Sequence, residues 1–357
     1  MVKAFKYRIY PNAEQRQYFS KTFGCTRFIY NRMLHDKIEH YNLTEETLKN
    51  TPAQYKEEFP WLKEVDSLAL ANAQINLEKA YKNFFRDKSV GFPKFKSKKN
   101  NHRSYSTNNQ KGTVNIENGC IKLPKLKSMV RIKQHRQFEG LIKSCTISQT
   151  PSGKYFVSLL VECDIEQLLQ SEAKIGIDVG LKTFAVMSNG KEIANPKYIR
   201  RSEKRLAKLQ KDLSRKANGS NNRAKARLKV ARLHEKISNQ RFDFLQKVSS
   251  EIINDNQVIV LEYLKVKNMV KNHKLAKAIS EVSWGMFRTM IEYKAEWYGR
   301  EVVIAPSNYA SSQLCSECGN KSSQTKDLSC RTYICLECGL EIDRDYNASL
   351  NLVKLAV

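Results

Sequence analysis

Long apolar runs are missing from this sequence. Among its 357 residues, no stretch approaches the about 18 consecutive apolar residues that a membrane-spanning helix requires. The first segment, MVKAFKYRIYPN, also lacks the apolar core of a secretory signal peptide, and no internal repeat is visible. These absences predict a cytoplasmic protein without a membrane anchor.

Acidic residues are scarce relative to basic ones. The sequence has 36 Asp and Glu against 62 Lys and Arg, which gives a formal net charge of +26. Such an excess repels itself in a compact chain unless a polyanion neutralises it, so the composition favours a nucleic-acid partner. A ribosome-associated protein would fit the same charge. A membrane-surface protein is disfavoured, because no basic amphipathic helix stands alone.

The six histidines are not spaced as metal ligands are, so they predict no metal site. Four of the cysteines do have such a spacing. Cys315 and Cys318 form one Cys-x-x-Cys-Gly motif, and Cys335 and Cys338 form another, with 335 − 318 − 1 = 16 residues between them. That spacing is typical of a four-cysteine zinc ribbon, in which four thiolates close the shell around one structural Zn²⁺. Redox-active dithiols are the alternative, but the thioredoxin-like βαβ setting is missing. The remaining cysteines fit no ligand set: Cys25, Cys120, Cys145, Cys163 and Cys330.

The period of the apolar residues divides the chain into segments. Residues 5–9 alternate apolar and basic side chains, which predicts a strand with one buried face. Asn12 and Gln15 resemble a capping box at the start of a helical region. The period returns to two after about residue 105. We therefore expect a small β-barrel or sandwich whose first strand comes from the start of the chain, with a helical insertion: residues 1–11 and 103–165 for the former, 12–102 for the latter.

The second half, residues 172–357, mixes strands and helices. The runs KIGIDVG, NQVIVLEYL and REVVIAP predict buried strands, so we expect an α/β domain. Residues 197–247 predict two helices and contain 17 Lys or Arg but four Asp or Glu. A charged run is often a solvated helix face. The imbalance in sign favours a surface that contacts a nucleic-acid backbone.

Three acidic residues stand where they could meet. Asp178 and Glu262 each end an apolar strand run, and a third acid lies in DRDYNASLNL. Three converging carboxylates can hold two Mg²⁺ ions about 4 Å apart, which activate water and stabilise the leaving oxygen of a phosphodiester. A single strand-end acid is usually just solvated. Three of them in so basic a chain predict a metal-dependent nuclease.

The motifs together resemble those of the TnpB (OrfB) family, transposon-encoded proteins related to type V CRISPR effectors. GIDVGLKTFAV, VIVLEYL, the cysteine pairs and DRDYNASLNL occur in the family's order and spacing, and FKYRIYPNAEQ, AYKNFF and GFPKFK match its first half. The resemblance implies an RNase H-like RuvC nuclease domain with a zinc ribbon inserted at 308–342. It also implies that the barrel is a wedge domain and that its helical insertion is a recognition domain.

The resemblance further implies an RNA-guided DNA endonuclease. Such a protein binds a transposon-end guide RNA (omega RNA), recognises a short transposon-adjacent motif, and cleaves guide-matched double- or single-stranded DNA. It needs Mg²⁺, for which Mn²⁺ can substitute, and one structural Zn²⁺. The expected setting is the nucleoid of a prokaryotic cell, with a monomer or a dimer per RNA.

Carried over residue by residue, the resemblance assigns catalysis and Mg²⁺ binding to Asp178, Glu262 and Asp345. The family's Asp-x-Asn-Ala pattern selects Asp345, with Asp343 in reserve, because helical residues two apart point about 200° away from each other. Tyr263 and Ala310 depart from the family's usual residues without removing a ligand. A transcriptional regulator without cleavage would need a broken triad, and a strand-joining transposase would share the metal centre. Both stay as alternatives.

Nucleic-acid contacts are expected on several polar and basic side chains: Gln74, Asn76, Lys79, Tyr81, Lys82, Lys94, Lys96, Arg200, Arg201, Lys204 and Lys208. Phe84 and Phe85 are predicted to lie in the core, and Trp284 to serve in packing. LKVKNMVKNHKLAKAIS, after Glu262, reads either as a mobile basic lid or as an ordinary loop.

Overall fold

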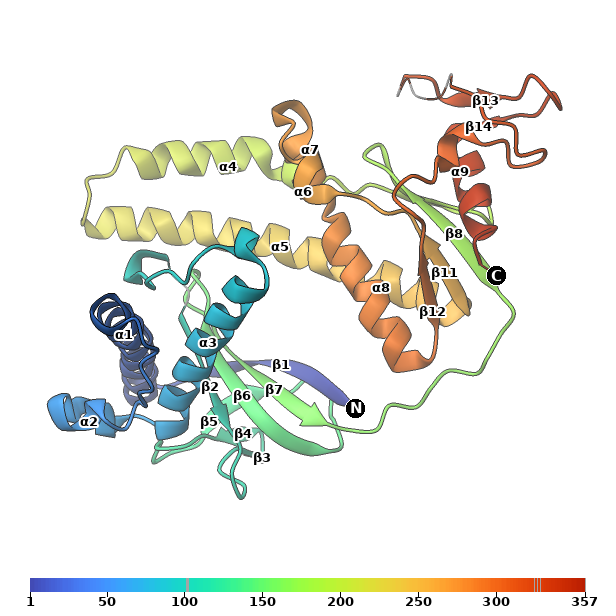
Figure 1. Ribbon diagram of the computed structural model, residues 1–357. Helices are drawn as coiled ribbons and strands as arrows, with labels where there is room; N and C mark the ends of the chain where they lie inside the picture. The colour runs from blue at the N-terminus through green and yellow to red at the C-terminus, as the bar shows by residue number, and fades with distance from the viewer. Residues whose placement is uncertain (101–102, 324, 326, 328, 357) are drawn as a thin grey trace. The chain divides into compact units, whose positions relative to one another are not determined.

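The computed structural model describes residues 1–100, 103–323, 325, 327 and 329–356, and it contains two compact units, Met1–Asp164 and Ile165–Val357 (Figure 1). Residues 101 and 102, in the predicted helical insertion, lie outside the described residues. So do 324, 326 and 328, in the predicted zinc ribbon. Across the described ranges, no helix is both long and apolar enough to cross a membrane.

The first unit contains an antiparallel sheet, and its described strands follow the order β2-β6-β7-β1-β5-β4-β3. Strand β1 stands between β7 and β5, so the start of the chain completes a sheet whose other strands follow residue 103. Tyr7 and Ile9 are buried, which confirms the predicted alternation. The strands are β1 Val2–Tyr10, β2 Arg103–Asn108, β3 Asn115–Glu117, β4 Cys120–Lys122, β5 Val130–Lys133, β6 Leu141–Gln149 and β7 Tyr155–Glu162.

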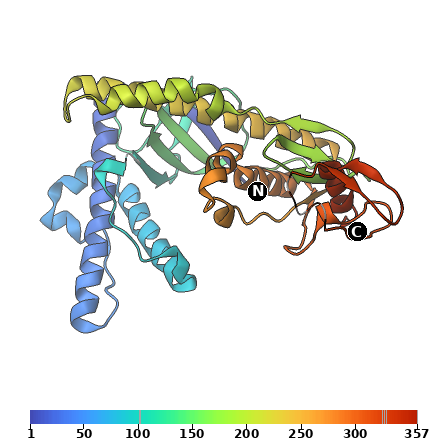
Figure 2. The same cartoon turned by 90° about the horizontal axis from the view of Figure 1, so that it is seen from above.

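Helices α1 (Ala13–Thr44), α2 (Tyr55–Glu58) and α3 (Ser67–Arg86) lie between β1 and β2 in the chain. Figure 2 shows α1 as one long rod. The predicted capping box is present: Asn12 Oδ1 accepts from the Gln15 amide at 2.8 Å, and Gln15 Oε1 accepts from the Asn12 amide at 2.9 Å. Asp66 caps α3 and also accepts the hydroxyl of Thr107 on β2, so this helix is tied to the sheet.

The second unit is built on a mixed sheet with the order β10-β9-β8-β11-β12 in its described part. Strands β8, β9 and β10 are antiparallel, whereas β11 and β12 run parallel to β8. The bounds are β8 Lys174–Val179, β9 Thr183–Met187, β10 Glu192–Ala194, β11 Val258–Leu261 and β12 Glu301–Ile304. β11 is fully buried, as its apolar run predicted. The same prediction for REVVIAP is wrong, because β12 is an edge strand whose Glu301 is exposed.

Helices cover both faces of this second sheet. α5 (Asn221–Asp255) and α8 (Trp284–Tyr298) pack on one face through a core that includes Ile177, Leu245 and Phe287. α9 (Arg344–Val353) covers the other face at β8 (Figure 1). There Gly176 is required, because a Cβ at this position would lie 2.2 Å from the Ser349 carbonyl oxygen.

The remaining elements of the second unit are α4 Tyr198–Ser214, α6 Val266–Met269, α7 His273–Val282, β13 Thr332–Ile334 and β14 Glu341–Asp343. α4 and α5 form the predicted basic hairpin (Figure 1). The segment after Glu262 is helical, so the prediction of an ordinary loop is wrong. Glu281 of α7 explains part of this order, because its carboxylate accepts from the Ile199 amide at 2.7 Å, at the start of α4.

Candidate active site and zinc ribbon

Asp178 and Glu262 stand side by side at the carboxyl ends of two parallel strands. Ile177 of β8 is in register with Leu261 of β11, so the two acids occupy the next position on neighbouring strands. The alternation of side chains puts them on the face that α9 covers, since Gly176 and Val260, two residues earlier, both belong to that face. The carboxyl ends of parallel strands are where α/β proteins usually place their ligands.

Asp345 reaches the same region from α9. It lies in the first turn of the helix that packs on β8, four residues before Ser349. Asp343, the reserve candidate, caps this helix instead. Its Oδ1 accepts from the amides of Asp345 and Tyr346, both at 2.9 Å, as the N-cap of α9. Asp343 therefore stabilises the start of the helix, and the charges of both acids act on Asp178.

The neighbouring acids affect the pKa of Asp178. Burial raises the pKa of Asp178 well above its ordinary value, and the charges of Glu262 and Asp345 raise it further, while Arg344 acts in the opposite direction. Burial also raises the pKa of Glu262. A half-buried cluster of like charges is the environment that a divalent cation would relieve, and oxygen donors of this kind suit Mg²⁺. The donor set fits the predicted metal.

The oxygen atoms are nevertheless not packed as tightly as in a metal shell. In the described part of the chain, the sets of three or more ligand-type atoms within 4.8 Å of one another are the four paired cysteines and His35, Asp36 and Glu39. Asp345 is instead held by two arginines: Arg344 Nη2 lies 2.8 Å from its Oδ1, and Arg331 Nη1 lies 3.3 Å from its Oδ2. Sequence reasoning missed both arginines, because no spacing rule links them to the acids.

A small crevice of about 50 Å³ adjoins Glu262 on the side of α6 and α8. Its walls are mostly apolar and include Val266 and Trp284, and Arg288 stands at its edge. Trp284 is buried, in agreement with the predicted packing role. Val266 of α6 therefore lies beside Glu262.

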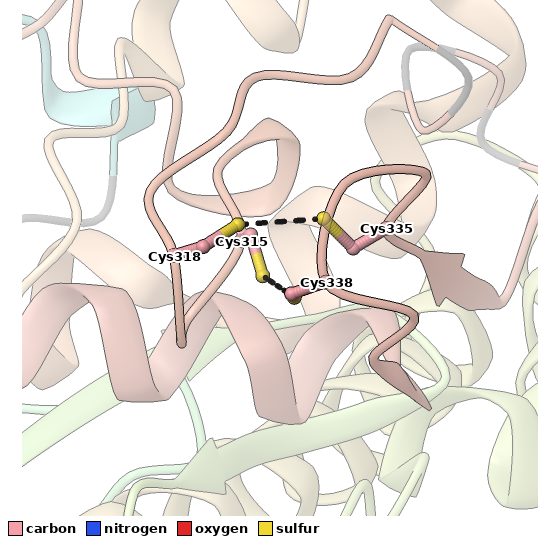
Figure 3. Close-up of side chains that lie close together, drawn as sticks. All are labelled: Cys315, Cys318, Cys335 and Cys338. Atoms are coloured by element: carbon pink, nitrogen blue, oxygen red, sulfur yellow. Dashed lines mark hydrogen bonds between the residues drawn. The ribbon is translucent and has the colours of Figure 1, made fainter.

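The four paired cysteines converge in a compact cluster (Figure 3). Cys315 Sγ lies 3.5 Å from Cys338 Sγ, and Cys318 Sγ lies 3.5 Å from Cys335 Sγ. A regular tetrahedron of sulfurs about 2.3 Å from Zn²⁺ has edges of about 3.8 Å, so the cluster fits this ion. Hydrogen bonds from the backbone amides of Cys338 and Glu337 lower the pKa of Cys335, whereas burial and the other thiols of the cluster raise the pKa of Cys338. Cys330 is not in the cluster; its thiol donates to the Thr332 carbonyl.

The two cysteine turns have the same construction. The amides of Cys315 and Cys335 donate to the carbonyls of Asn320 and Leu340, both at 2.8 Å. Gly319 and Gly339 follow with φ of +77° and +75°, a left-handed conformation that glycine adopts without strain. Each glycine therefore lets the chain turn directly after its cysteine pair.

Two buried asparagines join the first cysteine turn to α9. Asn347 Oδ1 accepts from the Ser316 amide at 2.9 Å, and its Nδ2 donates to the Leu314 carbonyl at 2.7 Å. Asn351, one helical turn later, donates to the same carbonyl at 2.7 Å. The NASLN stretch contributes to the family resemblance, but sequence reasoning missed this structural role. The ribbon is therefore bound to the helix that carries Asp345.

The predicted nucleic-acid residues lie on two surfaces, one in each unit. In the first unit, Asn76 and Lys96 line a cavity of about 380 Å³ together with Arg27 and Asn72, which sequence reasoning missed. Gln74 is half-buried and donates to Glu78, and Lys79, Lys82 and Lys94 are exposed. In the second unit, Arg200, Arg201, Lys204 and Lys208 are exposed along α4. A cavity of about 590 Å³ between α4 and α5 adds Arg205, Lys229, Arg232 and Lys236.

Models of three protein families match this chain. The OrfB model of IS605 elements, described as "Probable transposase", matches residues 156–273, and the "Cas12f1-like, TNB domain" model matches 284–352. The "Helix-turn-helix domain" model of the same OrfB family matches 1–46, where the structure has β1 and one helix, α1. Among solved structures, the protein of a "Cas12f1-sgRNA-target DNA complex" shares the fold, with a TM-score of 0.64 at 14% identity over 99% of this chain and 98% of that one.

Two curated relatives extend the match to almost the whole chain. A protein of Streptomyces pristinaespiralis is 39% identical over 98% of this chain and 88% of its own length. InsQ of Escherichia coli K12 is 32% identical over 99% of this chain and 92% of its own length. Each is described as a "Putative RNA-guided DNA endonuclease". The chain therefore belongs to the OrfB family of IS605 elements, the TnpB family that its motifs resemble.

Proposed function

We propose that this protein is an RNA-guided DNA endonuclease with a RuvC-like active site formed by Asp178, Glu262 and Asp345. The observation that carries the proposal is the arrangement of the acids: two end parallel neighbouring strands, and the charge of the third raises the pKa of Asp178. The strand order, three antiparallel strands followed by two parallel ones, supports an RNase H-like domain. The relatives, each named as an RNA-guided DNA endonuclease, support the activity.

The protein's own groups would prepare the reaction as follows. Asp178, Glu262 and Asp345 would hold two Mg²⁺ ions, and the bound ions would supply activation of water and charge stabilisation at the leaving oxygen of the phosphodiester. Arg331 and Arg344 form ion pairs with the Asp345 carboxylate. An incoming cation would share this carboxylate with them. The zinc ribbon keeps α9 in place through Asn347 and Asn351 and takes no direct part, because four thiolates leave no open coordination position.

Nucleic acid would bind to the basic surfaces of both units. The guide RNA recognises the target by base pairing, while exposed lysines and arginines contact phosphates without reading sequence. The described part of α4 and α5 contributes the largest run of such side chains. The polar cavity of the first unit, with Asn72 and Asn76, is suited to reading groove edges in the short motif next to the target.

The test uses protein purified with the RNA that it retains from cells, and the sequence of that RNA defines the DNA substrate. Plain broken ends in the presence of Mg²⁺ support the endonuclease, joined products favour a transposase, and bound but uncut DNA favours a regulator. Asp178→Asn and Asp345→Asn should each lower the cleavage rate by at least about 100-fold while DNA binding persists.

Asp343→Asn is the matched control. Asparagine also accepts hydrogen bonds at an N-cap, so this variant should keep α9 and most of the cleavage rate. If Asp343→Asn abolishes cleavage and Asp345→Asn does not, the two residues have been assigned the wrong way round. If all three variants cut normally, the active site lies elsewhere.

A further inference from the structure

Four aromatic rings form a cluster at the end of α3 in the first unit; Tyr81, Phe84, Phe85 and Phe92 are its members, here called the ring cluster. Tyr81 and Phe85 lie one helical turn apart with their rings nearly parallel, 19° between planes and 6.3 Å between centroids. Phe92 stands edge-on to Tyr81 at 5.5 Å and to Phe84 at 5.4 Å. The rings therefore support one another in fixed orientations.

The outer rings of the cluster, Phe85 and Phe92, are exposed, so the prediction that Phe84 and Phe85 lie in the core is wrong for Phe85. Phe85 is 72% exposed and Phe92 is 44% exposed, while Phe84 is half-buried. The following turn holds this arrangement. Asp87 accepts from the Ser89 amide at 2.9 Å, and Gly91, with φ of +77°, returns the chain so that Phe92 reaches α3. Since the rings gain little from burial, a binding partner is a better explanation than core packing.

The charge around the ring cluster indicates the kind of partner. Residues 81–99 contain seven Lys or Arg and one acid, Asp87. Lys82, Lys88 and Lys94 are all exposed next to the rings in the chain. A second aromatic cluster in this unit, Phe28, Phe59 and Trp61, has mixed charge around it, because Glu57, Glu58 and Glu64 are close in sequence and the Arg32 guanidinium lies 6.0 Å from the centroid of the Phe59 ring. Positive charge beside exposed rings is the combination that single-stranded nucleic acid binds.

We propose that the ring cluster is a stacking platform for an unpaired base of an RNA or DNA strand, whose phosphates contact the adjacent lysines. The proposal deepens the proposed function, since it assigns a separate site to the nucleic acid that the enzyme handles. A stack on Phe85 requires little reorganisation, because Tyr81 and Phe84 already fix the ring. A duplex would not benefit, because its bases are already stacked on each other.

The full-length protein is titrated with three probes: a single-stranded DNA, an RNA of the same sequence, and the DNA duplex, with a 2-aminopurine in each single strand. Phe85→Ala should weaken single-strand binding about 5- to 30-fold and remove the quenching of 2-aminopurine, with little effect on the duplex. Phe85→Trp should keep both signals. Trp61→Ala removes an aromatic ring from the second aromatic cluster. This variant is the matched control and should bind like wild type.

The two single strands identify the source of the base, because the strand that loses more affinity in Phe85→Ala is the natural occupant. Equal losses for single strand and duplex, or no loss, would overturn the proposal. So would a wild-type dimer in sedimentation that Phe85→Ala dissociates, because the patch would then bind a second copy. Guided cleavage by the wild-type chain is scored separately, with Asp178→Asn as the inactive reference: a wild type that does not cleave but shows the Phe85 effect refutes the proposed function and leaves the platform standing.

Discussion

Gly176→Ala should test whether the contact between β8 and α9 positions the active site. A Cβ at residue 176 would lie 2.2 Å from the Ser349 carbonyl oxygen and 2.5 Å from the Val353 amide nitrogen. Both are backbone atoms of α9, so no side chain can rotate away. Because such contacts normally exceed about 3.2 Å, α9 would have to move by about 1 Å.

Two consequences of that shift can be measured. Overpacking of this kind costs about 1–3 kcal/mol, or about 2–10 °C in the Tm of the second unit. Asp345 would move relative to Asp178, and a 1 Å displacement of a catalytic group can lower the rate by about 100-fold. Calorimetry and guided cleavage assays follow the two effects separately.

Gly24→Ala is the matched control for this substitution. Gly24 lies inside α1, and a Cβ there would have nothing within 4 Å. Alanine is the better helix former, so the control should be stabilised by about 0.5–1 kcal/mol and should cleave normally. A Gly176→Ala protein with the Tm and cleavage rate of wild type would refute the claim that α9 is held against β8.

Two further predictions concern the zinc ribbon and a buried lysine. Cys335→Ser should lower bound zinc from one ion per chain to near zero by elemental analysis and reduce cleavage, whereas Cys330→Ser should do neither. Burial lowers the pKa of Lys294 to about 8, and its Nζ donates to Ser249 and Ser250. The unfolded chain then binds more protons than the folded one between pH 8 and 10.5. The free energy of unfolding should rise across that window by up to about 1.4 kcal/mol per pH unit from this group. Urea unfolding should show this rise in wild type and in exposed Lys211→Met, but not in Lys294→Met.

Local patterns predicted much of this molecule from its sequence. The Asn12 capping box, the alternation in β1 and the cysteine spacing each depend on residues close together in the chain, and the structure has all three features. The acid that follows each apolar run also predicted where the strand ends: Asp178 and Glu262 both stand at the ends of their strands. Their assignment to catalysis stays a prediction that the variants above test.

Features that depend on distant neighbours could not be predicted. Phe85 continues the apolar pattern of α3, and this pattern predicted that it would be buried. Phe85 is exposed, because burial also depends on which distant segments pack against that turn of the helix. β12 has a core-like sequence but lies at a sheet edge. Arg344 shares Asp345 with Arg331, and Asn347 bonds to a turn 33 residues earlier in the chain. The periodicity of the sequence gives no information about such pairings.

The packing of α9 on β8 also sets the order in which the second unit can mature. The strand begins at residue 174 and the helix ends at residue 353, so ribosomes adding about 5–20 residues per second need on the order of ten seconds or more between them. From their own synthesis until that of α9, Val258 and Val260 lack their cover from Leu352. Nascent chains would therefore carry an uncovered sheet face until α9 has been synthesised, which makes prematurely terminated chains targets for chaperones and proteases.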